Sequence, residues 1–372
     1  MEGRANPLRV LFVASGEAGG AEYALATHLR HRPDWIEGRV LLLAPGPAAD
    51  LFAAAGLDVT AGSLRSPIRP RGLAAFAGSF AGELRRARPA VVHATGIRAA
   101  LACAAACRLL RVPLVWHKVD LAFDRRLAVP LALLSSGVVA VSAATAAALP
   151  PRRLLGIVPS PVRLESSFAV SAERPPATIG SVGRLVAHKG HGRVIEAAAR
   201  LLPSHPHLRV LIAGAPVPYE AGEERRLREL AERLGMRQRV ELLGHVDRIE
   251  DVLERLTILV GATYDDGREG SGFEGLGSSL VQGSWAGLPV VATLGGGTPE
   301  AVVDGVTGIL VPPSDQAALA DAIERYLGDP EAARSAGRAG AAFAREHFAP
   351  AQVTPRLFES LARAARPRRR LR

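Results

Sequence analysis

Two basic residues and one carboxylate carry the clearest chemistry in this sequence. Arg184 and Lys189 stand five residues apart in the stretch GRLVAHKG, directly after a short predicted strand at residues 178–182. An arginine offers a bidentate fork and a lysine a mobile point charge, so both suit phosphate oxygens. Glu274 stands beside a Gly-rich turn, and a carboxylate can accept two hydrogen bonds from a polyol. Phosphate next to polyol predicts a sugar nucleotide as the ligand.

The glycines that follow Glu274 predict two helix starts. One turn, Gly275, Leu276 and Gly277, precedes a helix that we expect from Ser278 to Ala286. A short strand at residues 290–293 and a second Gly-rich turn at residues 295–297 lead into another helix. The free backbone N–H groups at such starts favour anions, phosphate above all.

A further Gly-rich loop lies near the beginning of the chain. The apolar run at residues 8–14 is followed by Gly19, Gly20 and Glu22, and then by a helical stretch to His31. Strand, glycines and helix in this order begin a doubly wound α/β domain. The loop is neither a Walker A sequence nor a clean G-x-G-x-x-G, which disfavours a nicotinamide dehydrogenase.

Two histidines stand at the carboxyl ends of predicted strands. His93 lies in the run at residues 90–94, and His117 ends the run at residues 112–117. Ligands of open α/β sheets gather at that edge, and an imidazole there can hydrogen-bond a sugar hydroxyl or share a proton. A satisfied structural histidine is the alternative for each.

The segment from residue 272 to residue 313 resembles the donor-binding signature of family 4 glycosyltransferases, retaining enzymes of the GT-B fold. Glu274 matches the first Glu of that pattern, and residues 287–292, 296–300 and 304–308 match its later parts in register. The second Glu of the pattern is missing, because Gln282 stands in its place.

This resemblance implies roles for individual residues. Arg184 and Lys189 would hold the donor diphosphate, Glu274 the sugar hydroxyls, and Gln282 would lie near the ribose. For Glu22 a purely structural role in a tight turn is the alternative. The residues expected to be catalytic are Glu274, His117, Arg184 and Lys189. The expected donor-binding set is Gly19, Gly20, Arg184, Lys189, Gly244, His245, Val246, Glu274, Gly275, Leu276, Gly277 and Gln282, and the acceptor-side set is Glu22, His93 and His117.

The resemblance also implies the architecture, two Rossmann-like doubly wound domains that face each other across a cleft. We expect an acceptor-side domain at residues 1–165 and a nucleotide-sugar domain at residues 166–348. A proline-rich stretch at residues 150–176 reads as the linker. Residues 349–372 would hold a helix that crosses back to the first domain, followed by a basic tail.

Composition narrows the class of protein. A chain of 372 residues suits two domains, and no apolar run reaches the 18 residues of a spanning helix. The start does not read as a signal peptide. Cys103 and Cys107, four apart, suit one buried helix face rather than a metal or redox pair, so we expect the cytoplasm. The net charge is +10, and six of the arginines that produce it stand in the last twelve residues.

We therefore predict a retaining glycosyltransferase that moves a sugar from a nucleotide sugar, expected to be a UDP-sugar, to a hydroxyl acceptor. No cofactor and no metal is expected, and Asp265 and Asp266 read as a polar loop. The arginine tail could attract anionic membranes. The alternatives are a sugar-nucleotide 2-epimerase of the same architecture and, from charge alone, a nucleic-acid-binding protein.

Overall fold

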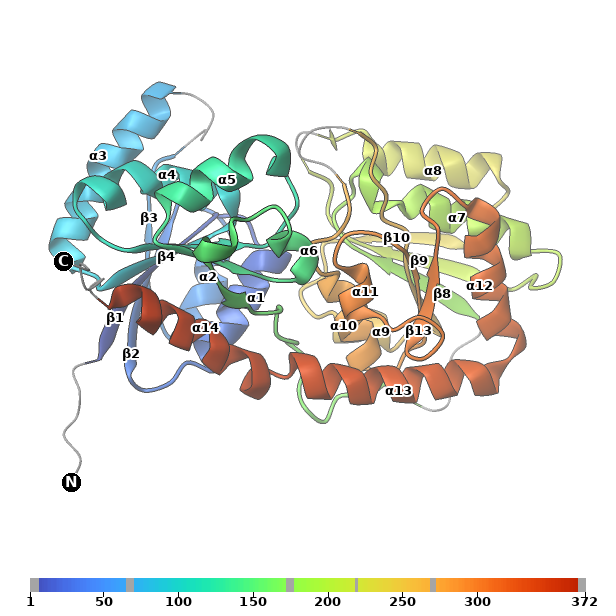
Figure 1. Cartoon of the computed structure of the whole chain (residues 1–372). Helices are drawn as coiled ribbons and strands as arrows, with labels where there is room; N and C mark the ends of the chain where they lie inside the picture. Colours follow the sequence, from blue (N-terminus) through green and yellow to red (C-terminus); the bar gives the residue numbers. More distant parts are fainter. Residues whose placement is uncertain (1–6, 65–69, 172–176, 218–219, 268–271, 367–372) are drawn as a thin grey trace. The chain divides into compact units, whose positions relative to one another are not determined.

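The chain folds into two compact units, which are described separately (Figure 1). The structure is a computed structural model that describes residues 7–64, 70–171, 177–217, 220–267 and 272–366, with the backbone alone at residues 70–75 and 125. Unit 1 comprises residues 1–163 and 348–372, and unit 2 comprises residues 164–347. The division falls two residues before the boundary expected from the sequence.

Unit 1 is built on a seven-stranded parallel sheet in the order β3-β2-β1-β4-β5-β6-β7. In β1 every residue from Val10 onward is buried, as expected for a parallel sheet covered on both faces. Because β1 lies between β2 and β4, the strand order reverses there, which is where ligands of such sheets bind. The strands are β1 (Leu8–Ala14), β2 (Ile36–Leu42), β3 (Asp58–Ala61), β4 (Val91–Thr95), β5 (Leu114–Lys118), β6 (Gly137–Ala140) and β7 (Leu154–Ile157).

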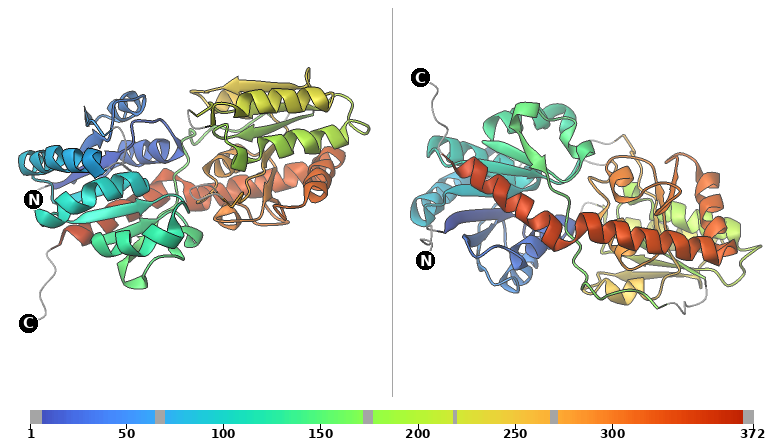
Figure 2. Two further views of the ribbon diagram at one scale, coloured as in Figure 1. Left: turned by 90° about the horizontal axis from the view of Figure 1, so that it is seen from above. Right: turned by 60° about the horizontal axis from the view of Figure 1, so that its bottom comes forward.

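Helices cover both faces of this sheet. Alternate residues of β1 show the two layers, because Leu11 packs with α3, α4 and α5, whereas Phe12 packs with α1, α2 and α14. The last of these, α14, is the final helix and lies along the sheet of unit 1 (Figure 2). The helices of unit 1 are α1 (Gly20–Arg30), α2 (Ala48–Ala53), α3 (Pro70–Ala87), α4 (Gly96–Leu109), α5 (Asp124–Leu134), α6 (Ala143–Ala146), the 3-10 turn η1 (Pro151–Arg153) and α14 (Pro350–Ala365).

Unit 2 is built on a six-stranded parallel sheet in the order β10-β9-β8-β11-β12-β13. Its strands are β8 (Thr178–Val182), β9 (Arg209–Ala213), β10 (Val240–Gly244), β11 (Ile258–Gly261), β12 (Val290–Thr293) and β13 (Gly308–Val311). Its helices are η2 (Ala187–Lys189), α7 (His191–Leu201), α8 (Glu223–Arg233), α9 (Glu250–Leu253), α10 (Ser278–Trp285), α11 (Thr298–Ala301), α12 (Gln316–Gly328) and α13 (Pro330–Phe348), whose last residue belongs to unit 1.

The linker prediction was wrong for residues 154–157, because they form β7, the edge strand of unit 1. Proline is tolerated beside an edge strand, so the flanking prolines did not exclude one. Two arginines of α14 satisfy the open edge: Arg363 donates to the carbonyl of Leu155 and Arg356 to that of Ile157, each at 2.6 Å.

Two further expectations concern α4 and the membrane. Cys103 and Cys107 are free and buried in α4, and burial raises the pKa of the Cys107 thiol to about 12. Such thiols are inert, in line with the predicted core role. Within the described ranges, no helix combines the length and apolar character that crossing a bilayer requires.

Candidate functional site

The centre of the candidate site in unit 2 is a contact between Lys189 and Glu274. Lys189 ends η2, just beyond β8, and Glu274 lies in the turn before α10. The Lys189 ammonium donates to Oε1 of Glu274, and the hydroxyl of Thr263 donates to the same oxygen at 3.2 Å. Both side chains keep access to solvent, with 17% of Lys189 and 22% of Glu274 exposed. The fold thus joins two predicted residues that are 85 positions apart.

The charge state of Glu274 follows from these contacts. Burial alone would raise the pKa of the Glu274 carboxyl, but the charge of Lys189 and the bonds from Lys189 and Thr263 outweigh it, so the pKa lies below its ordinary value. The group is therefore a carboxylate. An ammonium has three donors and a carboxylate about four acceptor sites, so the pair can still bind a phosphate and a hydroxyl.

Glycines lock the two turns next to Glu274 together. The N–H of Gly297 donates to the carbonyl of Glu274 at 2.9 Å, and a Cβ at Gly297 would lie 2.1 Å from the carbonyl oxygen of Gly275. Gly277 caps α10 with φ +89°, a left-handed conformation that favours glycine. The result is that the start of α10, with the backbone N–H groups of Ser278 and Ser279, borders Glu274.

A small cavity borders this pair. Its volume, about 10 Å³, has room for about one water molecule and none for a sugar. The lining residues are Ser181, Val182, Lys189, Gly261, Thr263, Glu274, Ser279, Leu280, Thr293 and Thr298.

The loop that carries Arg184 and Lys189 is held by His191, which the sequence reasoning missed. Nε2 of His191 lies 3.1 Å from the carbonyl oxygen of Arg184, and Nδ1 lies 2.9 Å from the hydroxyl of Ser181. A carbonyl only accepts, so Nε2 carries the proton and Nδ1 accepts from Ser181. Burial lowers the pKa of His191 to about 4, which keeps this tautomer neutral. The signal was a histidine on the first helical position after the phosphate-type loop.

A second missed imidazole, His188, belongs to the same loop. Its Nδ1 is buried without a partner among the described residues. Burial first, and then the neighbouring Lys189, lower the pKa of His188, while Glu274 acts in the opposite direction. The Arg184 side chain of this loop is exposed.

The remaining donor-side predictions lie farther from this centre. Gln282 is half-buried in the second turn of α10. Gly244, with φ +68°, ends β10, an edge strand two places from β8. His245 is exposed and its Nε2 lies 3.3 Å from Asp247, while Val246 follows it. The structure gives no contact that joins Gly244, His245 or Val246 to Glu274.

In unit 1, the predicted loop with Gly19, Gly20 and Glu22 is held by a hydrogen bond between its own residues. The hydroxyl of Ser15 donates to Oε1 of Glu22 at 2.7 Å, and Glu22 is buried at the start of α1. Burial raises the pKa of the Glu22 carboxyl, and the bonds from Ser15 and from backbone N–H groups of the loop oppose that rise. Glu22 therefore braces the loop in which Gly19 caps α1.

His93 and His117 form a buried pair on β4 and β5. The placement of His93 at the carboxyl end of its strand was wrong, because β4 continues to Thr95 and His93 is its middle residue, whereas His117 is the last residue but one of β5. Nε2 of His93 lies 3.2 Å from Nδ1 of His117, and 3% of His117 is exposed. Burial lowers the pKa of His117 to about 4 and that of His93 well below its ordinary value, so both are neutral. A third imidazole, His28 of α1, lies 6.4 Å from the His117 ring and is 3.0 Å from the Thr354 hydroxyl of α14.

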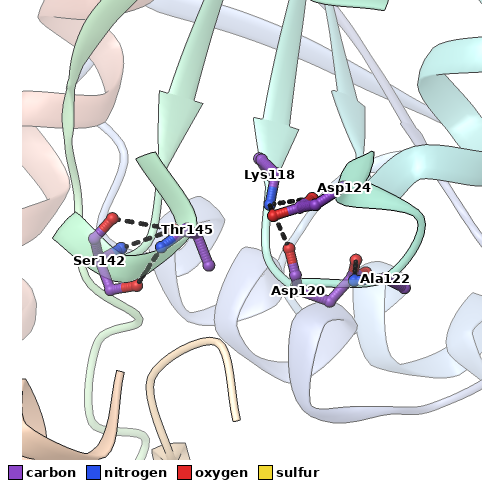
Figure 3. Close-up of polar contacts among 6 residues, drawn as sticks. All are labelled: Lys118, Asp120, Ala122, Asp124, Ser142 and Thr145. Atoms are coloured by element: carbon purple, nitrogen blue, oxygen red, sulfur yellow. Dashed lines mark hydrogen bonds and ion pairs between the residues drawn. The ribbon is translucent and has the colours of Figure 1, made fainter. Parts of the chain in front are cut away.

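The residue after His117 also matters, and the sequence reasoning did not use it. Figure 3 shows the Lys118 ammonium between the Asp120 carbonyl, at 2.6 Å, and Asp124, at 2.7 Å. Ser142 and Thr145 form a capping box at the start of α6 in the same view. Both sets of contacts hold loops at the carboxyl edge of the sheet of unit 1.

Metal ligands do not gather in the part of the chain that the structure describes: no group of three His, Cys, Asp or Glu there could hold an ion. Asp265 accepts from the N–H of Gly267 at 2.8 Å and so shapes its own turn. The predicted polar loop continues into residues 268–270, which lie outside the described residues.

Comparison with known families concerns unit 2. Residues 163–343 match the family described as Glycosyl transferases group 1. These residues include the Lys189–Glu274 contact, the loop at Arg184 and both Gly-rich turns. The match therefore covers the part of the chain in which the predicted donor-binding residues concentrate.

Curated relatives match less than half of the chain. The chain is 32% identical over 178 residues to an exopolysaccharide phosphotransferase of Streptomyces coelicolor, which covers 48% of this chain and 18% of that protein. It is 37% identical over 153 residues to the D-inositol 3-phosphate glycosyltransferase of Corynebacterium urealyticum, covering 41% and 35%. The chain thus spans well under half the length of these relatives, which are named for different reactions.

Solved structures match almost the whole chain. The Anabaena protein HepE, solved with UDP and glucose, has a TM-score of 0.82 at 22% identity, over 96% of this chain and 100% of that one. Together with the two parallel sheets, this similarity confirms the predicted fold, GT-B with two Rossmann-like units.

Proposed function

We propose that this chain, in which residues 163–343 match the family Glycosyl transferases group 1, is a retaining glycosyltransferase. It moves a sugar from a nucleotide sugar to a hydroxyl acceptor. The observation that carries this proposal is the contact of Lys189 with Glu274 at the start of α10, because it sets a phosphate-type cation beside a polyol-type carboxylate. The proposed donor is a UDP-sugar, since the similar protein HepE was solved with UDP and glucose.

The proposed chemistry is electrostatic. The bond from the anomeric carbon to the diphosphate breaks, and the bond to the acceptor oxygen forms on the same face of the sugar. The acceptor proton passes to an oxygen of the departing phosphate. Lys189, Arg184 and the first N–H groups of α10 stabilise the charge that develops on the diphosphate, with neither metal nor cofactor. Glu274 holds sugar hydroxyls and so orients the anomeric carbon.

The acceptor side of the proposal rests on unit 1. The neutral His117 imidazole can hydrogen-bond a hydroxyl without carrying charge, and His93 fixes its ring. Glu22 acts through the loop that it braces rather than as a charged contact, because it is buried against Ser15. We propose a cytoplasmic enzyme. Its arginine tail, which lies outside the described residues, adds attraction to anionic membranes.

The epimerase and the nucleic-acid alternatives are not proposed. No observation favours either, and six of the arginines behind the net charge of +10 stand in the last twelve residues rather than in a basic stripe. Assays without acceptor separate a transferase, which consumes no donor by epimerisation, from a 2-epimerase, which changes the sugar itself.

A panel of UDP-, GDP- and dTDP-sugars tests the proposal by thermal shift. A ligand at 100 times its dissociation constant adds about 2.7 kcal/mol to stability. The UDP-sugars should stabilise the chain, Lys189→Ala should lose the effect, and Arg237→Ala, an exposed change on unit 2, should keep it. Failure of every nucleotide sugar and of UDP itself to stabilise the chain would overturn the proposed function.

A further inference from the structure

Apolar side chains are unusually exposed on two neighbouring helices of unit 1. On α4, 76% of Leu109 is exposed, and on α5 the exposed fractions are 51% for Leu133 and 46% for Val129 and for Leu134. Val129 and Leu133 are four residues apart, so they share one stripe of α5. The opposite stripe, with Ala128, Leu131 and Ala132, is buried against the sheet. These leucines and this valine therefore do not belong to the core and form a second, exposed apolar face.

The two helices bring these side chains to one region. Both cover the same face of the sheet and contact each other (Figure 1). Each connects two neighbouring parallel strands, so α4 and α5 run in the same direction and their C-terminal ends lie together. Leu109 ends α4 and Leu134 ends α5, which sets both at the same end of the layer.

The charges around this apolar surface are of one sign. Residues 96–135 hold six basic and two acidic residues. Arg108, Arg111 and Arg126 are exposed. Of the two acids, Asp120 lies in the loop before α5 and Asp124 is the first residue of α5, and both bind the buried Lys118 ammonium. The outward surfaces of α4 and α5 therefore combine leucine and valine with arginine.

We propose that this surface, the α4–α5 face (Leu109, Val129, Leu133, Leu134, Arg108, Arg111 and Arg126), docks on an anionic lipid bilayer. Apolar side chains enter the boundary between headgroups and acyl chains, while arginines bind lipid phosphates. Each basic residue near such a surface adds to the attraction. The long arginine side chains can keep their charged ends at the headgroups while their stems cover apolar surface.

Charge and side-chain type select the lipid over other occupants. In a two-fold dimer the face would meet a second copy of itself, and the excess of positive charge on both copies would oppose the contact. Nucleic acid would satisfy the arginines through its phosphates but would leave the exposed leucines and valine without an apolar partner. A bilayer rich in anionic lipid matches both the charge and the apolar character.

Co-sedimentation of the full-length chain with vesicles tests the proposal. Vesicles of phosphatidylcholine with phosphatidylglycerol should bind the chain at least tenfold more tightly than phosphatidylcholine alone. Val129→Glu with Leu133→Glu should lower this binding at least tenfold. The matched control is Leu234→Glu with Val306→Glu, two exposed apolar positions of unit 2, and it should bind like the parent. Thermal unfolding and UDP stabilisation of each variant confirm folding independently of lipid.

A tail variant separates this face from the C-terminal arginines. Arg368→Gln with Arg369→Gln and Arg370→Gln leaves the face intact and should retain most of the binding. Loss of binding in the tail variant together with full binding in the Val129→Glu, Leu133→Glu variant would overturn the proposal. So would a dimer in sedimentation equilibrium that the face variant dissociates, since that result assigns the surface to a second copy.

Discussion

At the scale of single residues, Lys189 is the most informative position in the chain. It is one of two lysines in the sequence, and its ammonium contacts Glu274 in unit 2. A residue that stabilises developing charge affects the chemical step far more than folding, because it acts in the transition state.

We predict that Lys189→Ala lowers kcat on the order of a hundredfold, as does loss of one oxyanion-type donor. Arg184→Ala should have a similar effect, since its side chain is exposed in the same loop. The measurement is turnover with saturating donor, with Arg237→Ala as the control. Full activity in either variant means that the diphosphate assignment is wrong.

Gln282 is the position at which the sequence departs from the pattern it resembles. An amide has one acceptor oxygen and two donors, whereas a carboxylate accepts on both oxygens and makes stronger, charged bonds. We predict that Gln282→Glu keeps activity and tightens UDP binding by about 1 kcal/mol, the usual difference between charged and neutral hydrogen bonds. Calorimetry on both forms measures it. Equal or weaker affinity in the Glu variant would place ribose elsewhere.

At the scale of elements, the strand-to-helix connection after β8 determines how the loop presents its charges. The His191 imidazole accepts from the Ser181 hydroxyl in β8 and donates to the carbonyl of Arg184 in the loop. It therefore positions the loop without any proposed contact to the ligand. We predict that Ser181→Ala weakens UDP binding about fivefold and that His191→Phe weakens it more, since a lost hydrogen bond costs about 1 kcal/mol.

Measuring both the UDP affinity and the free energy of unfolding of each variant separates a positioning role from a general loss of stability. His191→Asn can restore one bond to the loop and should recover part of the UDP affinity of His191→Phe. If all three variants bind UDP like the parent, His191 has no role in the site.

Elements were predictable where the pattern was long or punctuated by glycine. The run that became β1 is mainly apolar, and Gly277 predicted the start of α10. The edge strand β7 was missed, because four residues between prolines carry no period of their own and depend on arginines from α14. β3 is largely exposed, so it too lacks a sequence pattern that predicts a strand.

The site was predictable in composition but not in its supports. A resemblance pointed to Lys189 and Glu274, and the fold supplies their contact. The role of Lys118 was not predictable, because a lysine at the end of an apolar strand normally extends into solvent. In the structure it is 1% exposed and bound to Asp124. Contacts between residues on different elements depend on tertiary packing, which periodicity does not encode.

At the scale of the whole molecule, buried neutral histidines make stability depend on pH. His28, His93 and His117 lie together in unit 1, and His191 lies in unit 2. Burial lowers the pKa of each below the ordinary value, to about 4 for His117 and His191. Between pH 6.5 and about 4 the unfolded chain binds protons that the folded chain does not. The free energy of unfolding therefore falls as the pH falls through this window.

We predict that acidification from pH 7 to pH 5 costs about 2 kcal/mol for each histidine whose pKa is about 4, measured by urea unfolding. His117→Asn removes one such group, so its loss of stability between the two pH values should be smaller by about that amount, whatever the variant costs at pH 7. The exposed His207→Asn is the matched control and should follow the parent. If His117→Asn loses as much stability on acidification as the parent does, the folded chain takes up a proton at His117 as readily as the unfolded chain. Burial would then not be what keeps this imidazole neutral on the proposed acceptor side.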